Sequence, residues 1–251
     1  QFLETLVAHR QNPDFCLPRD WYDLNRQWRA AWVDKMLADL DHETAQPAFE
    51  GRIHPLQLAL DVQGAMSDGD WLVIDGGNTH FWSEIAVNIA GFQGKKLGGI
   101  LHPGTFSLLG VGVSFAVSAK NVDPNRNVVL ISGDGAFLSG GLSIEAAFQE
   151  NCPIVVVIDN NGGLDCISQQ QERLFASGTH YATDFRDIPF HAMFEGLGGH
   201  GELVTRREDI IPAVQRAMAS GKTACVNVKV KGVISPIVLA TTSKRDKASI
   251  E

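Results

Sequence analysis

The sequence contains few cysteines and no arrangement of them that would hold a metal ion or a disulfide framework. Its four cysteines, Cys16, Cys152, Cys166 and Cys225, are scattered. They form no C-x-x-C pair, and no histidine stands at the spacing of a zinc site from any of them. We therefore expect reduced, mostly buried thiols, as in a reducing compartment.

Excess positive charge and long apolar runs are also missing. Lys and Arg number 21 against 29 Asp and Glu, a formal net charge of −8, so no sequence-wide basic field exists to bind nucleic acid or anionic lipid. No apolar run approaches the roughly 20 residues of a membrane span, and the first residues lack the charged-then-apolar order of a signal peptide. We expect a soluble, cytoplasmic protein that contacts neither nucleic acid nor a membrane.

The remaining composition is that of a globular protein. The chain has 251 residues, of which 44% are hydrophobic and 20% charged, and this length fits one domain with an appendage. Residues 1–45 show helix-type spacing around three tryptophans, and residues 46–53 have the composition of a linker. Because the chain starts with Gln1 rather than methionine, we expect a processed, split or truncated N-terminus.

Apolar runs alternate with helical patterns between residues 54 and 235. The runs VVLI at 128–131 and IVVVI at 154–158 are continuously apolar, as in parallel strands covered on both faces. We predict a three-layer α/β/α domain with a mainly parallel sheet, preceded by the short helical segment and followed by a polar tail at 236–251. The predicted strands are 71–74, 128–131, 154–158, 202–204 and 224–230, and the predicted helices are 55–66, 108–119, 142–150, 188–197 and 208–219.

Three predicted strands run into turns rich in glycine and polar residues: DGGNTH at 75–80, GDGA at 133–136 and DNNGG at 159–163. In parallel sheets, ligands bind beyond the carboxyl ends of the strands. Asp134 and Asn161 would project oxygen ligands from neighbouring strand ends, which suits Mg²⁺ together with phosphate. The alternative is a pair of ordinary turns in which Gly and Asn permit left-handed backbone and Asp caps a helix.

The spacing of these motifs resembles the signature of thiamin-diphosphate (ThDP) enzymes, in which a GDG turn is followed after 24 residues by NN, here at 160–161. GTFSLLGVGVSFAVSAK at 104–120 is similar to the glycine-rich helix start of acetolactate synthases, oxalyl-CoA decarboxylases and 2-hydroxyacyl-CoA lyases. DGGNTHFW at 75–82 is similar to their diphosphate loop. The resemblance spans roughly Ile53 to Ile234 and implies the C-terminal, cofactor-binding PP domain of these enzymes.

The resemblance implies a role for individual residues. Asp134 and Asn161 would bind Mg²⁺ through side-chain oxygens and Gly163 through its carbonyl. The backbone N–H groups of Gly135 and Ala136 would hold the diphosphate at the start of the following helix.

Further contacts with the cofactor are implied in the same way. Asn78 and Thr79 would contact the diphosphate from the first strand end, and Gly133 opens the GDG turn. Leu109 matches the bulky apolar residue over which the cofactor bends, and the carbonyl of Ser107 matches the acceptor for the aminopyrimidine amine. Leu109 is otherwise a core residue, and Asn78 is otherwise a turn residue.

Other polar residues near these motifs receive weaker assignments. His80 is either a substrate contact or a packed, hydrogen-bonded histidine. Cys166 is expected to be a small buried hydrophobe rather than a nucleophile, and the run QQQER at 169–173 is expected in a loop near the cleft mouth. No catalytic residue is assigned on this chain.

In ThDP enzymes a glutamate from a second domain, the PYR domain, activates the cofactor, and nothing in this chain resembles that domain. The resemblance implies the C-terminal half of an enzyme that makes or breaks a carbon–carbon bond beside a carbonyl of a 2-oxo acid or 2-hydroxyacyl-CoA. A PYR domain, on another chain or on a missing N-terminal half, would complete a dimer or tetramer. The alternatives are an acetolactate synthase catalytic subunit and a catalytically silent ThDP-binding regulatory domain.

Overall fold

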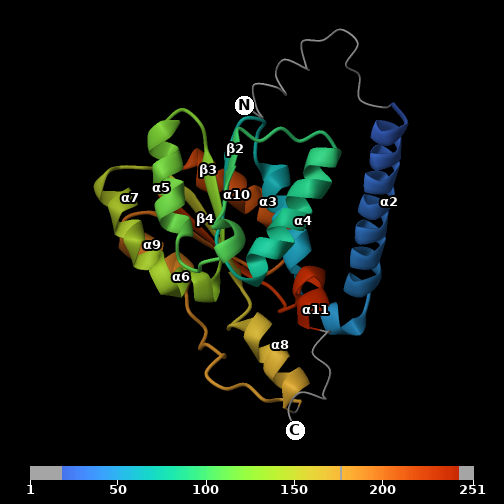
Figure 1. Ribbon diagram of the computed structural model, residues 1–251. Coiled ribbons are helices and arrows are strands. Elements are labelled where there is room, and N and C mark those ends of the chain that lie inside the picture. Colours follow the sequence, from blue (N-terminus) through green and yellow to red (C-terminus); the bar gives the residue numbers. More distant parts are fainter. Residues whose placement is uncertain (1–18, 176, 243–251) are drawn as a thin grey trace, which may run out of the picture. The chain divides into compact units, whose positions relative to one another are not determined.

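The computed structural model describes residues 19–175 and 177–242 (Figure 1). The chain divides into two compact units, Gln1–Glu43 and Thr44–Glu251. In the first, the described residues form one helix, α2 (Arg19–Thr44), which carries the three tryptophans of the predicted helical segment. That prediction is confirmed from residue 19 onward, and residues 1–18 lie outside the described part.

The second unit is built on a six-stranded sheet with the order β2-β1-β3-β4-β6-β5, in which every neighbouring pair of strands is parallel. The central strands are buried on both faces, which explains their unbroken apolar runs. The strands are β1 (Trp71–Ile74), β2 (Gly99–Leu101), β3 (Val128–Gly133), β4 (Val155–Asn160), β5 (His200–Val204) and β6 (Ala224–Lys229).

Helices cover both faces of this sheet, with α5, α7 and α9 on one face and α3, α4 and α10 on the other (Figure 1). On the first face, Phe137, Phe190 and Phe194 pack into a fully buried cluster with apolar strand residues. The predicted α/β/α architecture is confirmed. The helices are α3 (Pro55–Ala65), α4 (Asn78–Phe92), α5 (Gly112–Val122), α6 (Asp134–Gly140), α7 (Glu145–Gln149), α8 (Asp165–Leu174), α9 (Phe190–Gly196), α10 (Ile210–Ala219) and α11 (Pro236–Thr242), with 3-10 turns at Pro47–Phe49, Gly104–Phe106, Gly141–Ile144 and Arg207–Asp209.

Several elements differ from those predicted. The helix predicted from residue 108 begins at Gly112, because Gly110 adopts φ +86° and interrupts any helix before it. The QQQER run, predicted as a loop, lies inside α8. Helix α11 occupies Pro236–Thr242, where a polar tail was predicted; a proline at the first position and the apolar residues after it suit a helix start.

The order of the strands determines where a ligand can bind. The chain runs from β1 to β2 on one side and then passes to β3 on the other side of β1. Loops leaving β1 and β3 therefore diverge to opposite faces, and the carboxyl ends of these strands border a crevice, the usual ligand site of such sheets. None of the helices in the described part of the chain is long and apolar enough to cross a membrane.

Candidate functional site

A cavity of about 230 Å³ lies at the carboxyl ends of β1, β3 and β4. Its walls come from the turns after these strands and from the loop before α5, four segments far apart in the sequence. The structure brings every residue predicted to contact the cofactor to this cavity: Asn78, Thr79, Ser107, Leu109, Gly133, Asp134, Gly135, Ala136, Asn161 and Gly163.

Asp134 is the most constrained of these residues. Its side chain is only 3% exposed, and backbone N–H groups converge on both of its oxygens. Oδ1 accepts from Gly135 N at 2.7 Å, and Oδ2 accepts from Gly162 N at 2.7 Å and Gly163 N at 3.1 Å. Burial nevertheless raises the pKa of this carboxyl to about 6, so these hydrogen bonds offset only part of the cost of desolvation.

Asn161 lies beside Asp134 on the next strand end. Its Oδ1 accepts from Gly163 N at 3.1 Å. Two backbone hydrogen bonds hold the following segment against a neighbouring loop: Leu164 N donates to Thr183 O, and Phe185 N donates to Gly162 O. The two side chains therefore offer amide and carboxylate oxygens from a rigid backbone, which is the donor set that Mg²⁺ prefers.

Asp159 was not assigned a role from the sequence, yet it is a second buried carboxylate at this edge, 2% exposed. Its Oδ2 accepts from the Thr79 hydroxyl at 2.8 Å, whereas its Oδ1 accepts no hydrogen bond from any residue that the structure describes. Burial raises its pKa to about 7. A buried carboxylate oxygen without a hydrogen-bond partner among the described residues, at the same edge as Asp134, fits a bound cation there.

Residues of the β1 turn have further partners. The side chain of Asn78 donates to Val233 O at 2.6 Å and accepts from Ser235 N at 2.9 Å, so it ties the start of α4 to the segment before α11. Thr79 is engaged with Asp159, and the Gly135 N–H with Asp134. The contacts of these residues with a diphosphate stay predictions.

The opposite wall of the cavity is the loop before α5. Ser107 sits in the left-handed region at φ +46°, an unusual conformation for a residue with a side chain. Its carbonyl lies so close to Gly76 that a Cβ on Gly76 would stand 2.4 Å from that oxygen, so only glycine fits there. Leu109 borders the cavity and is 38% exposed.

Asp75 holds this wall in place and was also missed as a functional residue. Its Oδ1 accepts from Gly76 N at 2.8 Å and Gly110 N at 2.9 Å, and its Oδ2 accepts from the Ser132 hydroxyl at 2.9 Å. Asp75 and Asp159 share a signal in the sequence: each is a carboxylate at the end of a continuous apolar strand, where a charge is costly unless it is bound.

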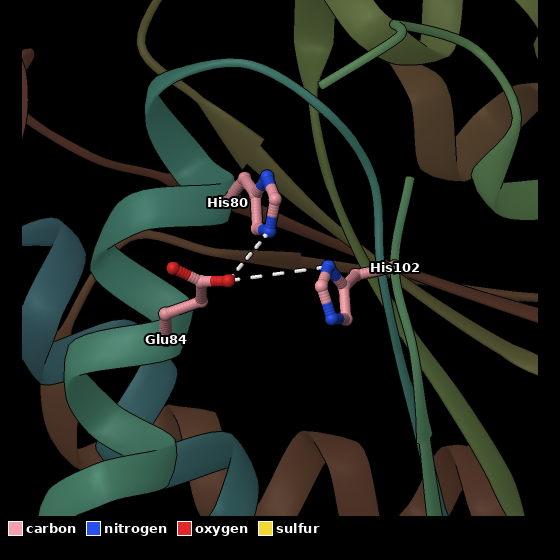
Figure 2. A group of neighbouring side chains, drawn as sticks. All are labelled: His80, Glu84 and His102. Carbon is pink, nitrogen blue, oxygen red and sulfur yellow. Dashed lines mark hydrogen bonds and ion pairs between the residues drawn. The ribbon is translucent and has the colours of Figure 1, made fainter. Parts of the chain in front are cut away.

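His80 is not among the residues that line the cavity, although its neighbours Thr79 and Phe81 are. It is 3% exposed, and its imidazole contacts Glu84 (Figure 2). Its Nδ1 also lies 3.4 Å from the Ser107 hydroxyl oxygen. Burial lowers the pKa of His80 and outweighs the opposing charge of Glu84. A contact with substrate stays a prediction for this residue.

Cys166 borders the cavity near the start of α8. Its sulfur accepts from Gln170 Nε2 at 3.5 Å, and burial raises the pKa of the thiol. A thiol with a raised pKa is a poor nucleophile. The side chain is only partly buried, however, which differs from the buried position expected from the sequence.

Comparison with known proteins places this geometry in context. The family described as "Thiamine pyrophosphate enzyme, C-terminal TPP binding domain" matches residues 75–228. The large subunit of acetolactate synthase from Mycobacterium tuberculosis is 34% identical over 182 residues, which cover 70% of this chain and 31% of that protein. The human 2-hydroxyacyl-CoA lyase 2 is 27% identical over 215 residues, or 80% of this chain and 32% of that protein.

A solved structure agrees with the sequence relatives. A thiamine diphosphate-dependent 4-hydroxybenzoylformate decarboxylase from Rhodococcus jostii RHA1 superposes with a TM-score of 0.61 at 26% identity, covering 74% of this chain and 34% of that one. The chain thus spans about a third of the length of the proteins it matches.

Proposed function

Because this chain belongs to the thiamine pyrophosphate enzymes and corresponds to their C-terminal TPP-binding domain, we propose that it is the cofactor-binding part of a ThDP- and Mg²⁺-dependent enzyme. The reaction cleaves or forms a carbon–carbon bond next to a carbonyl, as a 2-hydroxyacyl-CoA lyase or a 2-oxo acid decarboxylase or carboligase does. The observation that carries this proposal is the buried Asp134 carboxylate beside Asn161 in the cavity, with a second buried carboxylate, Asp159, at the end of β4.

Different residues of this chain bind different parts of the cofactor. Asp134 and Asn161 hold Mg²⁺ through side-chain oxygens, with the carbonyl of Gly163 as a third ligand. The N–H groups of Gly135 and Ala136 and the β1 turn at Asn78 and Thr79 bind the diphosphate. When bound, ThDP supplies the electron sink for a carbanion next to a carbonyl.

The apolar wall orients the other end of the cofactor. Leu109 supports its bend, and the carbonyl of Ser107 accepts a hydrogen bond from the aminopyrimidine amine. The strained backbone of Ser107 and its close approach to Gly76 keep this carbonyl in place. Leu109 and Ile167 both border the cavity and give it an apolar lining.

A PYR domain supplied elsewhere completes the site. The cavity of about 230 Å³ is smaller than the roughly 300–1,000 Å³ typical of ligand pockets. Its rim exposes Phe106 (94%) and Leu108 (60%), an apolar surface of the kind that marks an interface. Covering it with a PYR domain brings in the activating glutamate, most simply in a symmetric dimer or tetramer.

An acetolactate synthase activity is the second candidate, because the relative at 34% identity carries that name. To separate the candidates, the assembled protein is assayed with Mg²⁺, ThDP and three substrate types: pyruvate, an aryl 2-oxo acid and a 2-hydroxyacyl-CoA thioester. Acetolactate from pyruvate supports the second candidate, and an aldehyde product from either other substrate supports the first. Tight ThDP binding without turnover on any of them identifies a silent domain, and failure to bind ThDP overturns the proposal.

A further inference from the structure

A second cluster of metal-binding side chains lies outside the cofactor cavity. His80 and Glu84 stand on successive turns of α4, and His102 follows the end of β2 (Figure 2). One ligand atom from each residue lies within 4.8 Å of the other two. In Figure 2 both imidazoles turn a nitrogen toward the same oxygen of the Glu84 carboxylate.

The geometry points to a binding site for a divalent transition-metal ion of the Zn²⁺ type, held by His80, Glu84 and His102. The Oε1 atom of Glu84 is 3.0 Å from His80 Nε2 and 3.9 Å from His102 Nδ1. An ion with bonds of about 2.0–2.2 Å to each ligand requires ligand atoms roughly 3–3.5 Å apart. A small movement of His102 and Glu84 reaches this spacing.

Exposure of the three side chains suits an ion that enters from solvent. His80 is 3% exposed and fixed in the body of the domain, whereas Glu84 and His102 are 38% and 39% exposed. One ligand is therefore preorganised and two can close on the ion. Two imidazoles and one carboxylate leave at least one coordination position to water, as in open zinc sites.

A hydrogen bond behind the cluster favours coordination by the His80 Nε2 atom. His80 Nδ1 lies 3.4 Å from the Ser107 hydroxyl oxygen. With a metal ion on Nε2, the ring proton resides on Nδ1 and is donated to Ser107, the usual support for a metal-bound histidine. The ion has to displace two contacts: the 3.0 Å hydrogen bond between His80 Nε2 and Glu84 Oε1, and the 3.2 Å hydrogen bond that His102 Nδ1 accepts from Gly104 N.

The ion would be distinct from Mg²⁺ at the cofactor edge. Imidazole nitrogens select Zn²⁺ and its neighbours, whereas the Asp134 and Asn161 oxygens suit Mg²⁺. A bound ion joins α4 to the segment that leads into Ser107 and Leu109. We therefore expect it to stabilise the apolar wall of the cofactor cavity, although its binding does not depend on ThDP.

The test is a titration of the untagged, chelator-treated protein with Co²⁺, without ThDP and with excess Mg²⁺ to occupy the oxygen site. We expect one equivalent of Co²⁺ to bind with visible absorption bands. His102→Ala and Glu84→Gln should each weaken binding at least tenfold and abolish the rise in melting temperature that Zn²⁺ causes. Since both side chains are partly exposed, these variants should fold, and circular dichroism verifies it.

His180→Ala is the matched control. His180 also contacts two carboxylates, Glu172 and Asp184, but through opposite ring nitrogens, so no single ion reaches all three. Co²⁺ binding should be unchanged in this variant. X-ray absorption of the Zn²⁺-loaded protein should count two imidazole ligands. No bound equivalent, unchanged affinity in His102→Ala, or a site without imidazole would each overturn the assignment.

Discussion

The two walls of the cofactor cavity are built in opposite ways. The polar wall, at the β3 and β4 ends, includes the Asp134 carboxylate, which is 3% exposed and accepts hydrogen bonds from backbone N–H groups. At the same edge Asp159 is 2% exposed and accepts from the Thr79 hydroxyl. The apolar wall before α5 exposes large side chains, with Phe106 at 94% and Leu108 at 60%. The groups of the polar wall find their partners within this chain, whereas the apolar wall leaves large side chains exposed.

The difference between the walls suggests that each has its own role with the cofactor. Binding of a metal ion and a diphosphate needs fixed oxygens and N–H groups in a low-dielectric site, and the polar wall has both. We propose that bending and activating the other end of the cofactor requires a surface from another domain. We therefore expect changes in the polar wall to affect cofactor affinity and changes in the apolar wall to affect turnover.

The largest effect is expected for Asp134→Asn. This change keeps the shape of the side chain but removes the charge proposed to bind Mg²⁺, and it should weaken ThDP binding at least about 30-fold, or roughly 2 kcal/mol. Calorimetry on the assembled protein measures it. Asp187→Asn is the control, because that side chain is 80% exposed; equal affinities in the two variants would contradict the assignment.

A buried histidine outside the polar wall should make the stability of this unit depend on pH. His54 caps α3 by accepting from Leu56 N and packs edge-on against Trp82 of α4. Burial, aided by the charge of Lys231, lowers its pKa from 6.5 to about 4. Since the unfolded chain then binds the proton more tightly, the contribution of His54 to the free energy of unfolding should fall by about 2 kcal/mol between pH 7 and 5, whereas the raised pKa values of Asp134 and Asp159 act in the opposite direction.

Denaturant unfolding of wild type and His54→Asn at each pH measures this contribution. Asparagine keeps a side-chain acceptor at the cap but does not titrate. Between pH 7 and 5, the free energy of unfolding of wild type minus that of the variant should fall by about the amount attributed to His54. Parallel pH profiles for the two proteins would show that the buried imidazole contributes nothing to the loss.

Leu109→Ala probes the apolar wall. If Leu109 orients the cofactor, kcat should fall at least about tenfold while ThDP affinity stays within about threefold of wild type. Steady-state kinetics and calorimetry on the same preparation provide both numbers. Weaker cofactor binding with normal turnover would show that Leu109 only packs. It would also contradict the expectation that changes in the apolar wall affect turnover rather than affinity.

A smaller effect is expected for Asn161→Ala. The side chain is a neutral ligand and the charge of Asp134 remains, so ThDP affinity should fall by only about fivefold, or roughly 1 kcal/mol. The same calorimetry ranks it against Asp134→Asn. A larger loss of ThDP affinity in Asn161→Ala than in Asp134→Asn would indicate that the main metal ligand follows β4 rather than β3.

Much of the sheet was predictable because its strands carry a strong local signal. The predicted strand at 71–74 has the bounds of β1, and the central runs became β3 and β4. Helices with a weaker signal were missed. Helix α8 contains the polar run QQQER, and α4 begins directly at the glycine turn, so its first residues look like a loop.

The site residues that lie in sequence motifs were predictable, and those whose roles depend on tertiary contacts were not. Asp134 and Asn161 were found by their positions at strand ends, and the structure puts them on one cavity. The roles of Asp75 and Asp159 depend on burial and on partners 35 and 80 positions away in the sequence. The same holds for His80, whose environment includes Ser107 and His102. Such contacts arise only from folding.

The most direct test of the account compares ThDP affinity of the assembled protein in Mg²⁺ with that in EDTA, for wild type and Asp134→Asn. If the buried carboxylate edge holds the cofactor through a cation, wild type should lose at least about 30-fold in affinity when the metal is removed. The variant, already without the charged ligand, should lose far less. Equal affinity of wild type with and without metal would contradict the central claim.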